Sequence, residues 1–352
     1  MGKVRIGVVG AGTISDSHLS AYAARDDVEL VAVADVNADR ARKRQQEYGF
    51  TDYHDTAAAL FERDDIDAVS ICTWNNSHAE LTIAALDAGK HVLCEKPLCK
   101  TVAEAEAVVQ AVERSGKHLE IGYVRRYARN AEVLKRFIDG GDLGEIYYSK
   151  ASIIRRTGNP GGWFADVELS GGGPLIDIGV HCIDLAWWLM GGPKVTTVSA
   201  NTYTRLGNRG NIQNIGRYKA ADYDPSFNTV EDLANALVRF ENGSSMLVDV
   251  SFSLHAPQDS ILVAVYGDKG GAELEPQLKM VTEKYDTVLN LNPQIDKLSF
   301  DMASFHREIG HFVQLVQGTA EPMARVSDGL EMMKILRAIY ESADKGAEIT
   351  VQ

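Results

Sequence analysis

The chain has 352 residues, of which 45% are hydrophobic and 24% charged, as is ordinary for a globular protein. Its length predicts two domains in preference to one very large domain. Its net charge of −13 and its pI near 5.2 argue against nucleic acid or an anionic membrane surface as the main partner. No apolar run reaches the length of a membrane span, and the first residues lack the apolar core of a signal peptide.

The first informative stretch runs from Val4 to Ser15. An apolar run typical of a buried parallel strand breaks into Gly10-Ala-Gly12 and continues as a helix-forming segment. Gly10 permits a tight turn, and Gly12 lets backbone N–H groups approach a pyrophosphate at the positive end of the helix. The last position of the G-x-G-x-x-G pattern is Ser15, which is small enough for close helix–strand packing. A glycine turn that binds nothing is equally common, so this motif alone is weak.

A second apolar run ends at Asp35, which follows the second glycine by 35 − 12 = 23 residues. A carboxylate at this spacing is typical of an acid that binds the adenosine ribose. It repels a 2′-phosphate, and neither Val36 nor Asn37 supplies a cation to offset that repulsion. The two motifs together predict that NAD is preferred over NADP.

The rest of the first half alternates helical segments with short apolar strands, which is typical of a parallel, doubly wound sheet. Further strands are predicted over residues 68–72, 91–95 and 118–122. Helices are predicted over residues 13–25, 38–48, 55–63, 78–88 and 101–114.

Four cysteines, Cys72, Cys94, Cys99 and Cys182, show neither zinc-ligand nor disulfide spacing. Two of them fall inside apolar strand runs, which indicates buried, reduced thiols and a cytoplasmic location. The acidic run over residues 63–67 is explained better by a solvated turn than by a metal site, and no metal is expected.

Ligands of open parallel sheets bind beyond the carboxyl ends of the strands. Three polar clusters lie at such ends: residues 73–78, Glu95-Lys96-Pro97, and Arg125-Arg126. Pro97 favours an extended Lys96, whose ammonium group can hydrogen-bond a substrate hydroxyl and stabilise developing alkoxide charge. A surface lysine is the alternative. For His78, helix capping or simple exposure is as plausible as ligand binding.

The second half begins near residue 124 with a helix over 128–139 and a strand-like segment over 145–156. Two glycine-rich loops follow, over 157–164 and 170–174, and they are plausible walls of a substrate pocket. Trp163 can stack on a sugar or cyclitol ring, although a core or interface tryptophan is equally plausible.

Residues 174–190 are predicted to form a helix that ends at Gly191. Asp177, His181 and Asp184 fall at i, i+4 and i+7, so two carboxylates flank one imidazole on a single face. A carboxylate orients an imidazole and favours its protonated form, which suits a general base. A solvent-facing, salt-bridged stripe is the alternative.

Beyond a less regular stretch over 201–228, strand-like runs over 233–240 and 245–253 flank Asn242-Gly243, a strong hairpin signal. Strands are also predicted over 261–266 and 272–275, so an antiparallel sheet is expected here. Two helices, over 301–316 and 327–342, close the chain and carry no evident chemistry.

These residues resemble the glucose–fructose oxidoreductase/inositol dehydrogenase (Gfo/Idh/MocA) family. The resemblance rests on Gly10-Ala-Gly12, Asp35, Thr73-x-Asn75-x-x-His78, Glu95-Lys96-Pro97 and Asp177-x-x-x-His181, in the family's order along nearly the whole chain. It implies an N-terminal Rossmann domain over 1–123, and an α+β domain over 124–352 with a large, mainly antiparallel open sheet that binds substrate and serves oligomerisation.

The resemblance also implies roles for individual residues. Lys96 lies beside the reacting hydroxyl, His181 is the acid/base, and Asp177 supports them. Arg125 helps to hold the substrate, and Trp163 is the further candidate contact that the residues themselves suggest. The remaining residues implied in NAD binding are Gly10, Gly12, Thr13, Ile14, Asp35, Thr73, Asn75, His78, Glu95 and Lys96 itself.

The sequence therefore predicts an NAD-dependent dehydrogenase that oxidises a secondary alcohol of a cyclitol, sugar or related polyol, as a homodimer or homotetramer. One alternative is a glycosidase that oxidises its sugar transiently with NAD. Another is a non-catalytic sensor that binds the dinucleotide, although such relatives often lack the lysine or histidine that this chain retains.

Overall fold

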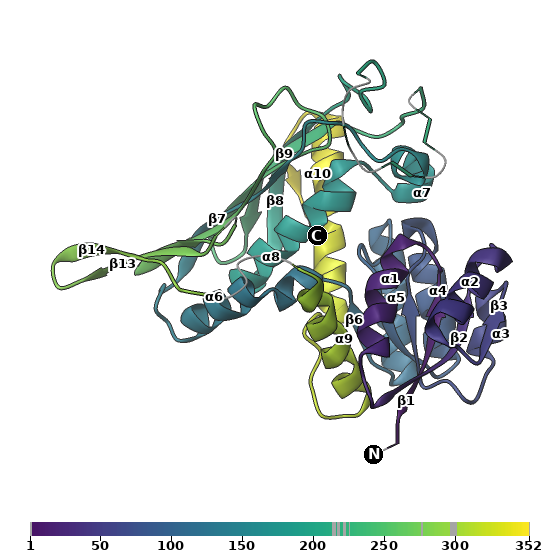
Figure 1. Cartoon of the computed structure of the whole chain (residues 1–352). Coiled ribbons are helices and arrows are strands. Elements are labelled where there is room, and N and C mark those ends of the chain that lie inside the picture. The colour runs from purple at the N-terminus through teal and green to yellow at the C-terminus, as the bar shows by residue number, and fades with distance from the viewer. Residues whose placement is uncertain are drawn as a thin grey trace. The chain divides into compact units, whose positions relative to one another are not determined.

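The computed structural model describes residues 2–212, 216, 219–220, 223–224, 226–275, 277–295 and 301–351 (Figure 1). The chain forms two compact units. Unit 1 consists of Met1–Tyr127 and Asp301–Leu330, and unit 2 of Ala128–Phe300 and Glu331–Gln352.

Unit 1 is built on a parallel sheet of six described strands in the order β3-β2-β1-β4-β5-β6. The strands are β1 (Val4–Val9), β2 (Val28–Ala34), β3 (Asp52–His54), β4 (Ala68–Ile71), β5 (His91–Cys94) and β6 (Leu119–Ile121). From β1 the chain first adds β2 and β3 on one side of the sheet. It then returns to the other side of β1 and adds β4, β5 and β6. The prediction of a doubly wound Rossmann domain is confirmed.

Helices α2 (Ala38–Tyr48) and α5 (Val102–Ser115) of unit 1 begin at side chains that cap them. Asn37 accepts the backbone N–H of Arg40, and Thr101 forms a capping box with Glu104. The helical elements are α1 (Thr13–Ala23), α2 (Ala38–Tyr48), α3 (Ala57–Phe61), η1 (Asn75–Ser77), α4 (His78–Asp87), α5 (Val102–Ser115), η2 (Val124–Tyr127) and α9 (Met302–Val316). Helix α10 (Val326–Lys345) starts in unit 1 and continues into unit 2.

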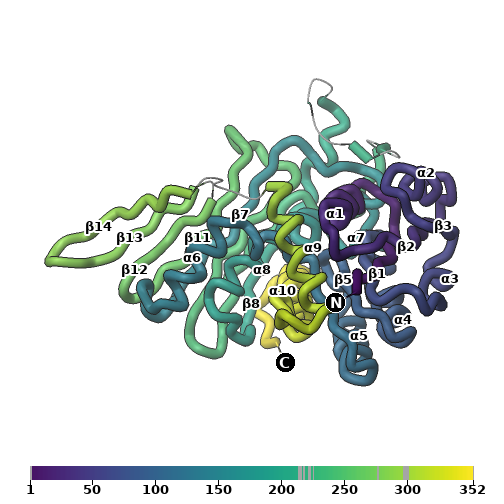
Figure 2. The backbone as a smooth tube through the Cα atoms, turned by 60° about the horizontal axis from the view of Figure 1, so that its bottom comes forward, coloured from purple at the N-terminus to yellow at the C-terminus, as the bar shows by residue number. Residues whose placement is uncertain are grey.

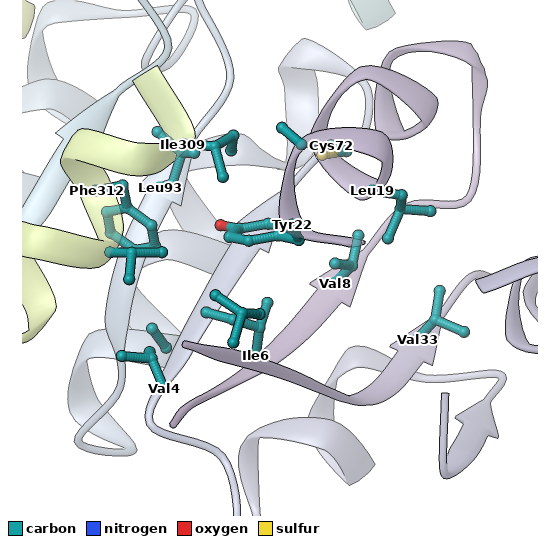
Figure 3. Packing of buried hydrophobic residues seen from close by; sticks show 14 of the residues in the cluster. Val4, Ile6, Val8, Leu19, Tyr22, Val33, Cys72, Leu93, Ile309 and Phe312 are labelled. Atoms are coloured by element: carbon teal, nitrogen blue, oxygen red, sulfur yellow. The ribbon is translucent and has the colours of Figure 1, made fainter. Parts of the chain in front are cut away.

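The core of unit 1 joins the beginning and the end of the chain. Leu19 and Tyr22 of α1 belong to one apolar cluster with Ile309 and Phe312 of α9 (Figure 3). Helix α9 accordingly packs beside α1, as Figure 2 shows. Residues 301–330, which the sequence analysis assigns to the part after residue 124, therefore lie in unit 1.

Unit 2 is built on a mixed sheet of nine described strands in the order β14-β13-β12-β11-β7-β10-β9-β8-β15. Only the β7–β10 pair is parallel among these strands, so the expectation of a mainly antiparallel sheet is confirmed. The strands are β7 (Ile146–Ile154), β8 (Val195–Tyr203), β9 (Leu233–Phe240), β10 (Ser245–Ser251), β11 (Ser260–Gly267), β12 (Gly270–Glu273), β13 (Lys279–Lys284), β14 (Thr287–Leu291) and β15 (Ile349–Thr350).

One face of this sheet is covered by helix. Helix α8 (Val180–Leu189) packs on β7, β10 and β11, while Leu247 and Asp249 of β10 point to the other face and are exposed. The other helical elements are α6 (Arg129–Asp139), η3 (Gly162–Ala165), α7 (Val167–Ser170) and η4 (Leu175–Gly179). Strands β13 and β14 form one edge of the sheet, drawn at the left of Figure 1.

Several local expectations need correction. The less regular stretch predicted over 201–228 begins too early, because β8 runs to Tyr203 and pairs with β9 as far as Leu233. Residues 213–215, 217–218, 221–222 and 225 of that stretch lie outside the described residues. The helix predicted over 174–190 begins with a π-helical turn, Leu175–Gly179, before it becomes α-helical.

All four cysteines are buried and free, as predicted. Across the described residues, no helix combines the length and the apolar character needed to cross a bilayer.

Candidate active site

The glycine turn after β1 is shaped for a close backbone approach. Gly10 has φ +95°, and a Cβ atom there would lie 2.5 Å from the carbonyl oxygen of Cys72, so only glycine fits. The space beside Gly12 is open, and no described side chain caps α1. Ser15, where the pattern has its third glycine, is buried and donates to the carbonyl oxygen of Gly12 at 2.6 Å. This turn fits the pyrophosphate of a dinucleotide, because it offers backbone N–H groups at a helix N-terminus.

Asp35 follows β2 and is coupled to this turn. Its carboxylate accepts the backbone N–H of Ala11 at 2.7 Å and that of Asn37 at 2.8 Å. The next residue, Val36, is 96% exposed. Asp35 thus lies at the glycine turn, the place expected for the predicted ribose-binding acid.

The segment after β4 folds inward. Asn75 is buried, and the hydroxyl of Ser77 donates to that of Thr73 at 2.7 Å. His78 is also buried, with Nδ1 2.7 Å from the carbonyl oxygen of Pro97 and Nε2 3.1 Å from that of Thr73. Burial lowers the pKa of His78, although its contacts with the two carbonyl oxygens act in the opposite direction. The alternative of an exposed His78 is wrong, and the residue ties two predicted site segments together.

Glu95, Lys96 and Pro97 follow β5, beside the end of β4. The Glu95 carboxylate accepts the backbone N–H of Lys96 at 3.2 Å and lies 2.9 Å from Nε2 of His18. Burial raises the pKa of Glu95. The hydrogen bond from His18 and the nearby charges lower this pKa by a larger amount, so the net shift is downward. Lys96 itself is partly exposed.

Behind Glu95 runs a buried polar network that the sequence analysis missed. Nδ1 of His18 lies 3.3 Å from the hydroxyl of Ser70, which is 2.8 Å from the hydroxyl of Tyr22. His18 and Tyr22 share one face of α1, four residues apart. A histidine on an otherwise apolar helix face was the available signal, but its partner Glu95 is 77 residues away along the chain.

Unit 2 carries the predicted Asp177 and His181. Asp177 lies in the π-helical turn and His181 in the first turn of α8, and both are partly exposed. Asp184 is only 1% exposed, so a solvent-facing stripe is excluded as the explanation of all three residues.

The start of this helical segment is fixed by Glu231, a second residue that the sequence analysis missed. Its buried carboxylate accepts the backbone N–H of Gly173 at 2.9 Å and of Leu175 at 3.2 Å, and the hydroxyl of Tyr340 at 2.8 Å. Burial raises the pKa of Glu231. These contacts hold the backbone two residues before Asp177.

The other two predicted substrate contacts lie in different units. Arg125 lies in η2 and is partly exposed, whereas the neighbouring Arg126 is fully buried and pairs with Asp328 at 2.8 Å. Trp163 of unit 2 is partly exposed and stacks on Phe164, with ring centroids 3.9 Å apart. Unit 1 thus brings the predicted NAD-binding residues, Lys96 and Arg125 to the carboxyl ends of its strands, while Trp163, Asp177 and His181 belong to unit 2.

Comparison with known families decides the classification. The profile of the Gfo/Idh/MocA oxidoreductase family, described as an NAD-binding Rossmann fold, matches residues 4–123, and the profile of the C-terminal domain of that family matches residues 132–273. The chain belongs to the Gfo/Idh/MocA family. This confirms the predicted oxidoreductase class and the predicted NAD cofactor.

Individual relatives match three quarters of the chain or more. The D-glucoside 3-dehydrogenase of Escherichia coli (strain K12) is 34% identical over 349 residues, which cover 98% of this chain and 97% of the relative. The myo-inositol 2-dehydrogenase of Thermotoga maritima is 31% identical over 76% of this chain and 74% of the relative. A levoglucosan dehydrogenase solved in complex with NADH shares the fold, with a TM-score of 0.86, 23% identity and 99% of both chains covered.

Proposed function

We propose that this Gfo/Idh/MocA protein is an NAD-dependent dehydrogenase that oxidises a secondary alcohol of a sugar, cyclitol or related polyol. The observation that carries the proposal is the Glu95-Lys96-Pro97 segment, anchored at the carboxyl end of β5 by His18 and His78. Relatives named as dehydrogenases of a glucoside and of an inositol support the substrate class. In this proposal residues 1–123 bind NAD, and residues 124–352 bind substrate and serve oligomerisation.

The chain's own residues handle orientation and the proton. NAD, when bound, supplies the hydride acceptor. The Lys96 ammonium group donates a hydrogen bond to the reacting hydroxyl and stabilises negative charge on its oxygen. His181 accepts the hydroxyl proton as the carbon–oxygen double bond forms, and Asp177 orients the imidazole. Arg125 and Trp163 hold the rest of the substrate.

In the same proposal, residues of unit 1 hold the cofactor. The backbone at Gly10 and Gly12, with Thr13 and Ile14 in the first turn of α1, holds the pyrophosphate. Asp35 accepts the adenosine ribose hydroxyls. Thr73, Asn75, His78 and Glu95 line or support the nicotinamide end, beside Lys96.

A substrate screen tests the proposal. Inositols, aldoses, sugar acids and glycosides are incubated with NAD, and NADH absorbance is followed together with substrate loss. Stoichiometric NADH supports a dehydrogenase. A glycoside that is cleaved without net NADH identifies the transient-oxidation glycosidase, and tight NAD binding without turnover of any compound identifies the sensor.

We also propose that the protein is a cytoplasmic homodimer or homotetramer. Its four free, buried cysteines favour a reducing compartment. The uncovered face of the unit 2 sheet supports self-association, because Leu247 is 44% exposed there and pairs across strands with Leu237 and Lys150. Light scattering of the protein and of a Leu247→Glu variant tests this, and a wild-type monomer at micromolar concentration contradicts it.

A further inference from the structure

Unit 2 contains a pocket of about 490 Å³ whose lining includes Thr157, from the loop predicted over 157–164, but none of the individually predicted site residues. It lies among the segments that follow β7 and β10 and the loop around residue 209. Its lining includes Arg156, Thr157, Arg209, Leu254, His255 and Ala256. Two arginines and a histidine thus meet in one hollow of a chain whose net charge is −13.

Arg209 is the unusual member of this lining. It is only 7% exposed, and one guanidinium nitrogen, Nη2, donates to the carbonyl oxygen of Leu254 at 2.8 Å. Its Nε is buried and has no hydrogen-bond partner among the described residues, and none of their carboxylates forms an ion pair with it. A guanidinium is always charged, and a buried charge is costly unless it is paired.

The loop that carries Arg209 is held on both sides, so the placement is built rather than incidental. The buried Asp232 carboxylate accepts the backbone N–H groups of Arg205 and Leu206. Asn208, also buried, donates to the carbonyl oxygen of Asp224 at 3.1 Å. The hydroxyl of Ser253 donates to the carbonyl oxygen of Gly207 at 2.6 Å. Arg209 itself takes φ 59°, a backbone conformation that is costly for a non-glycine residue.

The other charges among the described residues that line the pocket leave it positive. Arg156 donates through Nη1 to the carbonyl oxygen of Pro257 at 2.6 Å. Its Nε lies 3.9 Å from the Asp259 carboxylate, and both side chains are about half exposed, which makes this a weak pair. His255 is exposed at the mouth. Asp259 therefore offsets part of the Arg156 charge, whereas the Arg209 charge has no such counterpart among the described residues.

We propose that this pocket is an anion-binding site in which Arg209 pairs with the carboxylate or phosphate group of a small molecule, assisted by Arg156. Guanidinium groups bind such oxyanions through paired N–H···O bonds, and Arg209 has nitrogens still to pair. The anion is either free or carried by a sugar. The inference concerns unit 2 alone and does not depend on the proposed dehydrogenase activity.

Titration calorimetry on the full chain with inorganic phosphate tests the proposal, with sodium chloride of equal ionic strength as the control. We expect saturable phosphate binding in the wild type, at least a roughly tenfold weaker affinity in Arg209→Met, and a smaller loss in Arg209→Lys. Arg129→Met removes an exposed arginine of the same unit that pairs with Glu132, and it should bind phosphate like the wild type.

A second arm identifies the source of the anion. Glucose 6-phosphate and gluconate are compared with glucose as competitors of phosphate. If glucose 6-phosphate and gluconate displace phosphate but glucose does not, the site takes an anion carried by a sugar. If phosphate binds and none of the three sugars displaces it, the site takes a free anion. Both results support the site. If Arg209→Met does not fold, Arg156→Met should still weaken binding several-fold. Absence of saturable binding of every anion, or binding that neither arginine variant changes, overturns the proposal.

Discussion

Nε2 of His18 lies 2.9 Å from Oε1 of Glu95, and the two side chains are 0% and 7% exposed. His18 lies on the helix that begins at the glycine turn, and Glu95 is the residue before Lys96. One buried contact therefore connects the element proposed to hold the pyrophosphate to the segment that carries the proposed catalytic lysine. Because its partner sets the charge of Glu95, this contact has a measurable pH signature.

We predict that His18→Leu destabilises the protein by about 3 kcal/mol near pH 7, because it leaves a buried carboxylate without its partner. The pKa of Glu95 is lowered in the folded wild type, so this stabilisation is present above the unfolded pKa of a glutamate and is lost as the pH falls through the folded pKa. Urea unfolding from pH 3 to pH 7 should show a difference that is constant above the unfolded pKa of a glutamate, about 4.3, and shrinks as the pH falls below it. His306→Leu, at an exposed position of α9, is the control, and equal losses in both variants contradict the prediction.

Asp35 should set the choice of cofactor. We predict at least a roughly tenfold preference for NAD over NADP in kcat/KM, on the order of 1.4 kcal/mol. Asp35→Asn keeps an oxygen for the backbone N–H of Ala11 but removes the charge, so it should reduce the preference with less damage to the turn than Asp35→Ala. Equal use of both cofactors by the wild type, or an unchanged preference in both variants, rejects the role.

Lys96→Met should reduce kcat far more than it reduces NAD affinity, because the proposed role of the ammonium group is at the reacting hydroxyl. Lys43→Met, which removes a lysine with a 69% exposed side chain, should change neither quantity. Stopped-flow turnover and fluorescence titration with NAD on the same preparations measure the two effects. Near-normal turnover in Lys96→Met would reject the catalytic role and favour an ordinary surface lysine.

For His181 we predict a loss of roughly 10²- to 10⁴-fold in kcat upon substitution by alanine, the usual contribution of a positioned general base. Oxidation by the wild type should fall on the acid side, since an imidazolium cannot accept the hydroxyl proton. That acid limb should vanish in His181→Ala and move to lower pH in Asp177→Asn, because the imidazolium loses a supporting carboxylate. A wild-type pH profile in His181→Ala would place the base elsewhere.

Glu308 of α9 gives a stability prediction of opposite sign. Its carboxylate is fully buried and has no hydrogen-bond partner among the described residues, and burial, with the charges of Glu95 and Glu120, raises its pKa well above the usual value. The folded state therefore holds a proton that the unfolded state releases, and wild-type stability declines as the pH rises above the unfolded pKa.

Glu308→Gln removes this titration. Relative to the wild type, the variant should gain about 1.4 kcal/mol per pH unit from the unfolded pKa up to the folded one, with little difference near pH 4. Urea unfolding of both proteins across that range measures the gain. Glu113→Gln, at an exposed position of α5, should stay parallel to the wild type, and a pH-independent difference for Glu308→Gln contradicts the assignment.

The elements that sequence reasoning recovered are those defined by neighbouring residues. The glycine turn, the helices predicted over 38–48 and 101–114, and the strand Leu233–Phe240 all depend on local periodicity and local hydrogen bonds. The residues it missed depend on distant partners. His18 and Glu231 resemble an ordinary core histidine and an ordinary acid until the fold brings Glu95 and the backbone of Gly173 to them.

The edge strands β13 and β14 were missed for a related reason. Residues 279–284 and 287–291 alternate weakly and carry exposed valines such as Val281 and Val288, so their periodicity does not separate them from a loop. The same limit applies to α9. Its apolar stripe predicts a buried face, but nothing in the stripe indicates that the face lies against α1.

That pairing of α1 with α9 has a consequence for biosynthesis. Tyr22 and Phe312 share one cluster although 312 − 22 = 290 residues separate them. While the chain emerges from the ribosome, the strands and helices of residues 1–127 are complete long before the helix that seals their core has been made. Until translation nears its end, Leu19 and Tyr22 therefore lack the α9 side chains that cover them in the finished protein. A nascent chain halted before residue 301 should bind chaperones that do not bind the finished protein.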